Sequence, residues 1–125
     1  LSLLPMTISL LILILFRFVF LLGYVPTASM EPALKTGSLL LGVRVWGDIQ
    51  KGDIIVFRHN KEYLVKRVEA VEGDLIESNG ENLVVPEGGF YVLGDNGQCS
   101  YDSRYWEYPF VMNDDIVAKV ILPTR

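Results

Sequence analysis

The stretch that divides this chain is Val25-Pro26-Thr27-Ala28-Ser29-Met30-Glu31-Pro32. It places a serine in a short turn between two prolines, and it contains the first acidic residue of the chain. Before this stretch Arg17 is the only charged residue, whereas the remainder has the mixed charge of an ordinary globular chain. The composition therefore predicts an apolar anchor followed by a compact domain, with Ser29 as a candidate nucleophile between them.

Length and composition limit the possible classes of protein. The 125 residues suffice for an anchor and one domain of about 100 residues. A net charge of −4 argues against a nucleic-acid partner, because phosphate contacts need clustered Lys and Arg. Cys99 and His59 are the only residues of their types, so neither a disulfide nor a metal site is expected. A Ser-His-Asp triad would have to use His59, which we expect in a solvated hairpin turn.

The apolar N-terminal segment predicts a helix. Residues 1–16 carry no charge, but a spanning helix needs about 20 residues. A signal peptide is the competing interpretation, yet no basic segment or Ala-x-Ala site is present. Arg17 can reach the membrane surface, so we expect the helix to end near Phe16 or Arg17 and residues 18–24 to form an apolar connection. Residues 1–17 then form a transmembrane anchor that lacks its N-terminal part; a core helix of a soluble protein is the alternative.

The chain after residue 32 predicts short strands separated by Gly and Asp turns. We expect strands at 38–45, 54–57, 63–71, 75–77, 83–85, 90–93 and 116–122. Asn79-Gly80 is a strong hairpin signal between two of them. The fold class is therefore mainly β, with residues 18–125 forming a folded antiparallel β-sheet or small barrel behind the partial transmembrane helix.

Lys66 has an unusual place in this pattern. Residues 63–71 alternate so that Leu64, Lys66 and Val68 share one strand face, and a lysine between apolar neighbours is rare. Burial would lower the lysine pKa from about 10.4 towards 7 and leave a neutral amine that can accept a proton. The pattern leaves two interpretations open: Lys66 is the base that activates Ser29, or it is a structural lysine with a buried stem.

Four motifs follow one another along the chain. They are Pro26-Thr27-Ala28-Ser29-Met30-Glu31-Pro32, Gly52-Asp53-Ile54-Ile55-Val56-Phe57, Lys66-Arg67-Val68 with Gly73-Asp74, and Gly94-Asp95-Asn96 with Ser100-Tyr101-Asp102-Ser103-Arg104. In this order, behind an apolar anchor, they resemble the successive conserved boxes of type I signal peptidases. The resemblance extends from Arg17 to the last strand. It implies a membrane-anchored serine endopeptidase that removes signal peptides from exported preproteins.

The resemblance also implies roles for individual residues. Ser29 would be the nucleophile and Lys66 the general base of a Ser/Lys dyad. Thr27 matches an oxyanion-hole serine whose hydroxyl acts with the backbone N–H of Ser29. Ser100 matches the serine that orients the lysine amine. Asp102 and Arg104 match a supporting ion pair, with an ordinary surface pair as the alternative.

The implied substrate is the small-x-small cleavage site of a preprotein, bound as an extended strand. Candidate pocket residues are Val25, Pro26, Met30, Leu64 and Val65. The family's second domain would be short here, because few residues separate Gly73-Asp74 from Gly94. No cofactor or metal is implied. The expected location is the bacterial cytoplasmic membrane, crossed once, with the catalytic domain on the outer face; a mitochondrial inner-membrane peptidase shares these boxes.

The sequence departs from the family pattern at two places. Gly97-Gln98-Cys99 replaces basic and polar residues, and Glu107 replaces a glycine. Cys99 lies beside Ser100 and is itself a candidate nucleophile, although the serine and lysine motifs already supply one. A soluble self-cleaving Ser/Lys protease is disfavoured by the anchor and by the absence of a DNA-binding domain. A non-catalytic membrane-tethered assembly factor is disfavoured by the presence of both Ser29 and Lys66.

Overall fold

The computed structural model describes residues 3–25, 27–44 and 47–123. In these ranges one helix, α1 (Leu4–Val19), precedes the strands β1 (Phe20–Tyr24), β2 (Leu39–Val43), β3 (Ile54–His59), β4 (Glu62–Val71), β5 (Leu75–Ser78), β6 (Glu81–Val84), β7 (Gly89–Leu93), β8 (Val111–Met112) and β9 (Ile116–Leu122). Two single 3-10 turns, η1 (Gly97–Cys99) and η2 (Asn113–Asp115), lie between the later strands. Every described strand pair is antiparallel, which confirms the prediction of a mainly antiparallel β fold.

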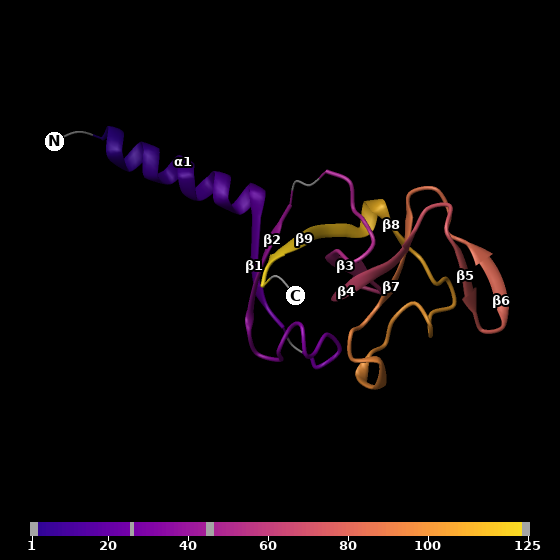
Figure 1. Cartoon of the computed structure of the whole chain (residues 1–125). Helices are drawn as coiled ribbons and strands as arrows, with labels where there is room; N and C mark the ends of the chain where they lie inside the picture. Colours follow the sequence, from indigo (N-terminus) through magenta and orange to yellow (C-terminus); the bar gives the residue numbers. More distant parts are fainter. Residues whose placement is uncertain (1–2, 26, 45–46, 124–125) are drawn as a thin grey trace.

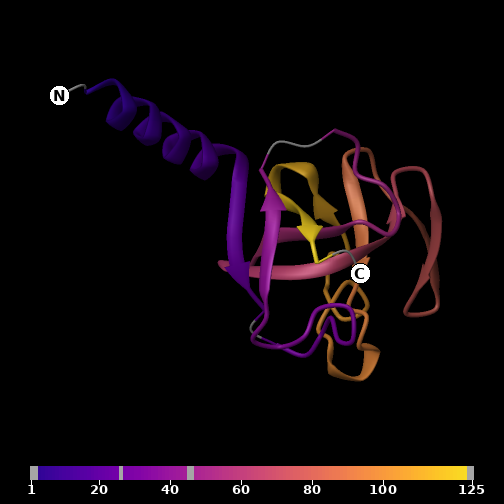
Figure 2. The ribbon, with the colours of Figure 1, turned by 60° about the vertical axis from the view of Figure 1, so that its left-hand side comes forward.

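The strands form one large sheet and one separate hairpin. The seven-stranded sheet has the order β1-β2-β9-β3-β4-β7-β8, and β5 pairs only with β6 among the described strands. Register shifts in the β2–β9, β3–β9 and β4–β7 pairs mark bulges, which increase local twist and help the sheet to curl. Figures 1 and 2 show the curled sheet, with the β5–β6 hairpin on the side opposite α1.

The core fills the curled sheet in two main clusters. One contains Val25, Met30, Leu34, Leu40, Ile54, Val56 and Ala118, and the other contains Ile55, Phe57, Val68, Val92, Trp106, Val111 and Ile116. Val25 and Met30 flank the serine turn in sequence, so burying them in the first cluster fixes that turn against the sheet.

The helix α1 projects away from the sheet (Figure 1). Its exposed apolar side chains include Leu4, Met6, Ile8, Leu10, Leu11, Ile12, Leu13 and Ile14. Within the described ranges, neither α1 nor any other helical segment has both the length and the apolar character that crossing a bilayer requires. The helix ends at Val19, two residues beyond Arg17, so the predicted end near Phe16 or Arg17 was too early.

The segment from residue 20 to 24 is a strand, and the prediction of a connecting segment there was wrong. β1 pairs with β2 at every residue, from Phe20 opposite Val43 to Tyr24 opposite Leu39. Pairing satisfies backbone N–H and C=O groups that an irregular apolar segment would leave without partners. Arg44 ties the junction, since its backbone N–H donates to Val19 O (2.6 Å) and its Nε donates to Phe20 O (3.2 Å). The helix therefore continues into the sheet with no loop between them.

Other boundaries differ by a few residues from those predicted. β3 and β4 extend to a two-residue turn, Asn60-Lys61, in which both residues have positive φ (48° and 69°). His59 consequently ends β3 and stacks on Trp106 (4.0 Å between ring centroids), so the prediction of a solvated loop histidine was wrong. Asn79-Gly80 forms the expected turn between β5 and β6. β8 was not predicted, because two residues give too short a pattern.

Candidate active site

Ser29 lies in the turn that follows β1 and is only 6% exposed. The Thr27 hydroxyl donates to Ser29 Oγ (3.2 Å), and the Ser29 backbone N–H donates to Thr27 Oγ1 (3.4 Å). The two predicted oxyanion donors therefore lie side by side and are hydrogen-bonded within the turn. A substrate oxygen would have to replace these bonds in order to accept from both groups.

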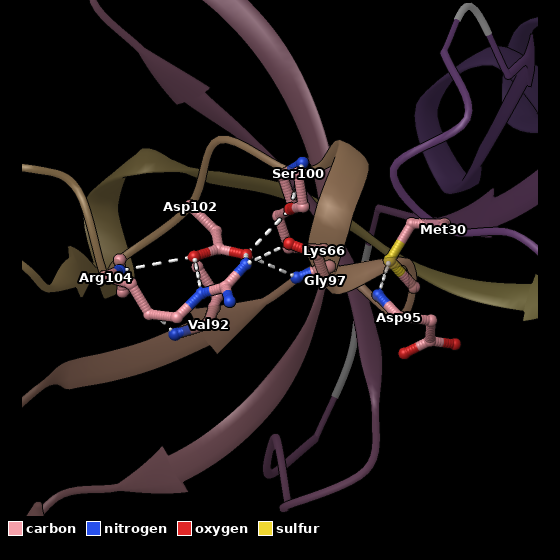
Figure 3. Close-up of polar contacts among 10 residues, drawn as sticks. Met30, Lys66, Val92, Asp95, Gly97, Ser100, Asp102 and Arg104 are labelled. Atoms are coloured by element: carbon pink, nitrogen blue, oxygen red, sulfur yellow. Dashed lines mark hydrogen bonds and ion pairs between the residues drawn. The ribbon is translucent and has the colours of Figure 1, made fainter.

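The loop between β7 and η1 is hydrogen-bonded to the turn that carries Ser29. Asn96 donates its backbone N–H to Ser29 O (2.8 Å) and its Nδ2 to Ala28 O (3.1 Å). The backbone N–H of Asp95 lies 3.4 Å from Met30 Sδ, as Figure 3 shows. A Cβ at Gly94 would lie 2.1 Å from Ser100 Oγ and 2.6 Å from Ser29 O, so only glycine fits there. The Gly94-Asp95-Asn96 motif was recognised in the sequence, but its contacts with residues 28–30 were not foreseen.

The Lys66 amine is buried and held by a short chain of hydrogen bonds (Figure 3). Lys66 is 3% exposed, and its Nζ donates to Ser100 Oγ (3.1 Å), which in turn donates to Asp102 Oδ2 (2.7 Å). Burial lowers the pKa of Lys66 below its ordinary 10.5; the negative charge of Asp102 offsets part of this shift, and the positive charge of Arg104 adds to it. The environment thus favours the neutral amine.

Asp102 anchors this chain from a fully buried position. Its carboxylate accepts from Arg104 Nε (2.8 Å) and Nη2 (3.0 Å) and from the Gly94 backbone N–H (2.9 Å). Burial opposes its ionisation, yet the hydrogen bonds from Arg104, Gly94 and Ser100 hold the pKa of Asp102 below its ordinary 3.8. Because the carboxylate is 0% exposed, the Asp102–Arg104 pair is not an ordinary surface pair.

Ser29 and Lys66 both line one pocket of about 440 Å³. Its lining residues are Val25, Thr27, Ser29, Met30, Glu62, Tyr63, Leu64, Val65 and Lys66. Four of the five predicted pocket residues are in this set, and the fifth, Pro26, lies outside the described residues. In the described part of the chain no hydrogen bond joins Ser29 to Lys66; Lys66 Nζ donates to Ser100 instead. Glu62 was missed because it was assigned to a polar turn, and Tyr63 was predicted to begin the strand but was not named as a pocket residue.

One edge of β4 is open beside this pocket. Residues 62–66 pair with β3 on one side, whereas pairing with β7 begins only at Arg67. Arg67 is fixed by a two-pronged ion pair, since its Nε and Nη2 each lie 2.8 Å from a carboxylate oxygen of Asp95. The backbone before Arg67 therefore offers hydrogen-bonding groups to an added strand.

The remaining sequence candidates lie apart from the pocket lining. Cys99 is exposed on η1, and His59 is in the aromatic stack with Trp106. Glu107 is exposed in the loop after that stack. Among the described residues, no group of three His, Cys, Asp or Glu side chains is placed to hold a metal ion.

A serine and a buried lysine in one pocket supply a candidate nucleophile and a candidate base. The family model for "Signal peptidase, peptidase S26" matches residues 1–85 and 78–124. These segments cover most of the sequence, and the chain belongs to this family of peptidases.

Individual relatives agree with this assignment. The chain is 28% identical over 135 residues to signal peptidase I of Leptolyngbya laminosa, covering 79% of this chain and 66% of the relative. It is 29% identical over 138 residues to signal peptidase IB of Staphylococcus aureus, covering 74% and 71%. The chain thus spans about two thirds of the length of these relatives. Both alignments are longer than the 125 residues of this chain, so the relatives contain insertions relative to it.

Proposed function

We propose that this protein is a membrane-attached serine endopeptidase that removes signal peptides from exported preproteins through a Ser29/Lys66 dyad. One observation carries the proposal: a buried serine and a buried lysine line the same pocket, and the lysine is anchored through Ser100 to Asp102. Family membership supports the same activity, since the relatives are named signal peptidases. No cofactor is needed for this chemistry.

In the proposed reaction Ser29 Oγ attacks the carbonyl carbon of the cleaved bond while Lys66 Nζ removes the hydroxyl proton. The peptide C–N bond then breaks as Lys66 returns that proton to the leaving amine. Water attacks the resulting ester, with Lys66 again taking a proton and returning it to Ser29. Thr27 Oγ1 and the Ser29 N–H stabilise the oxyanion once their mutual hydrogen bonds open. Ser100, Asp102 and Arg104 position the amine.

The open edge of β4 supports binding of the substrate as an extended strand. Residues 62–66 pair with β3 on one side and have no strand partner on the other side among the described strands. The apolar side chains of Val25, Met30, Leu64 and Val65 surround the space next to Ser29. We infer that this space accepts the small side chains of a small-x-small cleavage site, because β pairing would direct alternate substrate residues towards it.

Exposed apolar surface supports attachment to a bilayer. The side chains of α1 from Leu4 to Ile14 are mostly apolar and exposed. On the adjoining sheet, Leu22, Tyr24, Leu39 and Leu122 are also exposed, at 52–69% of their surface, and this group is here called the outer apolar face. Exposed apolar surface on both α1 and the adjoining sheet favours a lipid environment. By analogy with the bacterial relatives, we place the protein on the outer face of the cytoplasmic membrane, anchored through α1.

The test uses the full chain in detergent with a preprotein that carries an Ala-x-Ala site. Wild type is expected to cleave after this site, and Ser29→Ala and Lys66→Ala are each expected to lose at least about 10³-fold in kcat/KM. Lys119→Ala, which removes an amine that pairs with Asp53, serves as the matched control and should cleave normally. Cleavage that survives either dyad substitution would refute the proposed mechanism.

A further inference from the structure

Glu62 begins a row of side chains that leads into the pocket. Residues 62, 64 and 66 of β4 share one strand face, and all three line the pocket. Exposure falls along the row: Glu62 is exposed, Leu64 is half-buried and Lys66 is buried. The row therefore runs from the mouth of the pocket to its floor, with a carboxylate at the mouth.

The Glu62 carboxylate has no counter-ion among the described residues. The ion pairs found there use Lys51, Arg67, Arg104 and Lys119 as their cations. The nearest cationic residues in sequence are Arg58 and Lys61, and Arg58 lies over the ring of Tyr63, 5.9 Å from its centroid. Apart from Lys66, whose buried amine favours the neutral form, Glu62 is the one Asp, Glu, Lys or Arg in the described lining. The mouth of the pocket thus carries a negative charge available to a ligand.

We propose that Glu62 selects preproteins with a Lys or Arg at the fifth residue before the cleaved bond. This inference rests on the proposed function. A substrate strand along the open edge of β4 turns every second side chain to the same face. A small-x-small site has this period of two, so its first and third residues before the bond face Lys66 and Leu64. The fifth residue then faces Glu62. An exposed ion pair at this position gives a preference of about two- to fivefold.

The test measures kcat/KM for matched Ala-x-Ala peptides in neutral detergent at low salt. The peptides carry Lys, Gln or Glu at the fifth residue before the bond, or Lys moved to the fourth or sixth residue. Full-length wild type should prefer Lys over Gln at the fifth residue by about two- to fivefold, and salt should reduce this ratio. The ratio should fall to about one in Glu62→Gln and invert in Glu62→Lys. Glu81→Gln, which removes an exposed carboxylate from β6, should keep the wild-type ratio.

Because each readout is a ratio within one variant, a general loss of rate does not affect it. A preference that persists in Glu62→Gln, or that is equal for Lys at the fourth, fifth and sixth residues, would overturn the inference. Cleavage by wild type without any charge preference would overturn it while leaving the proposed function intact. If wild type cleaved none of the peptides, the proposed function would fail and the inference with it.

Discussion

At the scale of single residues, the protonation of Lys66 connects stability with the proposed activity. A buried amine is costly to charge, and here it shares one hydrogen-bonded chain with Ser100 and the ionised Asp102. In the unfolded chain the amine returns to its ordinary pKa. The folded protein is therefore less stable while Lys66 is protonated, and it gains stability as pH rises from the lowered pKa to 10.5.

Activity should also depend on the protonation of Lys66. We expect kcat/KM to rise with pH as Lys66 loses its proton, with a midpoint below 10.5, because only the neutral amine can accept the Ser29 proton. Lys66→Met should abolish this limb, reduce cleavage at least about 10³-fold and remove the matching part of the pH dependence of unfolding. A pH–rate profile combined with denaturant unfolding at several pH values measures both. A rate that stays constant throughout the range below 10.5 would contradict the assignment.

The residues of the site differ in how far the sequence could predict them. Period-two alternation placed Lys66 on an apolar face, and burial of the side chain agrees with that pattern. Asn96 could not be given a role in the same way, since it contacts Ala28 and Ser29 across almost seventy residues of chain and no local pattern encodes such a contact. Glu62 was assigned to a turn because β3 was expected to end with its apolar run at Phe57, whereas it continues to His59 and leaves a turn of only two residues before Glu62.

At the scale of elements, the β3–β4 hairpin determines where the pocket begins. Its two-residue turn places Glu62 opposite His59 and sets the register in which Lys66 faces Ile55. The sequence indicated both strands, but the predicted turn was too long, because Arg58 and Glu62 are polar residues near exposed strand ends. β1 was also missed: its apolar side chains suggested a membrane-proximal connection, whereas backbone pairing with β2 makes this segment a strand.

The turn itself offers a test of the hairpin. Lys61 has φ of 69°, a conformation that is unfavourable for a residue with a side chain. Lys61→Gly should therefore stabilise the protein by about 0.5–1 kcal/mol, because Asn-Gly suits a turn with two positive φ angles. Gly80→Ala in the β5–β6 turn, where φ is 79°, should destabilise by about 1 kcal/mol. Denaturant unfolding measures both changes, and a destabilised Lys61→Gly variant would contradict this account of the turn.

At the scale of the whole molecule, α1 runs directly into β1, which carries Leu22 and Tyr24 of the outer apolar face, whereas the β5–β6 hairpin lies on the side opposite α1 (Figures 1 and 2). For the bilayer attachment proposed above, this arrangement favours a single orientation of the domain. Between β4 and β7 the described residues form only the β5–β6 hairpin, so any second domain inserted at this point is small.

The outer apolar face should matter only when the substrate is in a membrane. Leu22 and Leu39 are 61% and 65% exposed, so replacing both by Glu should leave the fold intact. We expect Leu22→Glu/Leu39→Glu to reduce cleavage of a vesicle-embedded preprotein at least about tenfold, because two apolar contacts with lipid are lost, and to change cleavage of a detergent-soluble peptide little. Leu75→Glu, at an equally exposed position on β5, is the control. Equal losses with both substrates would argue against a role in membrane contact.

The junction at Arg44 links the length of α1 to the direction in which the sheet faces. Because α1 passes into β1 with no loop, and Arg44 bonds to both Val19 and Phe20, rotation of the helix about its axis is transmitted to the sheet. Each residue added to an α-helix turns whatever follows by about 100° and advances it by about 1.5 Å. The number of residues in α1 therefore sets the rotation of Ser29 and its pocket about the helix axis, so a single residue inserted before Phe20 would turn the pocket by about 100° relative to the start of α1.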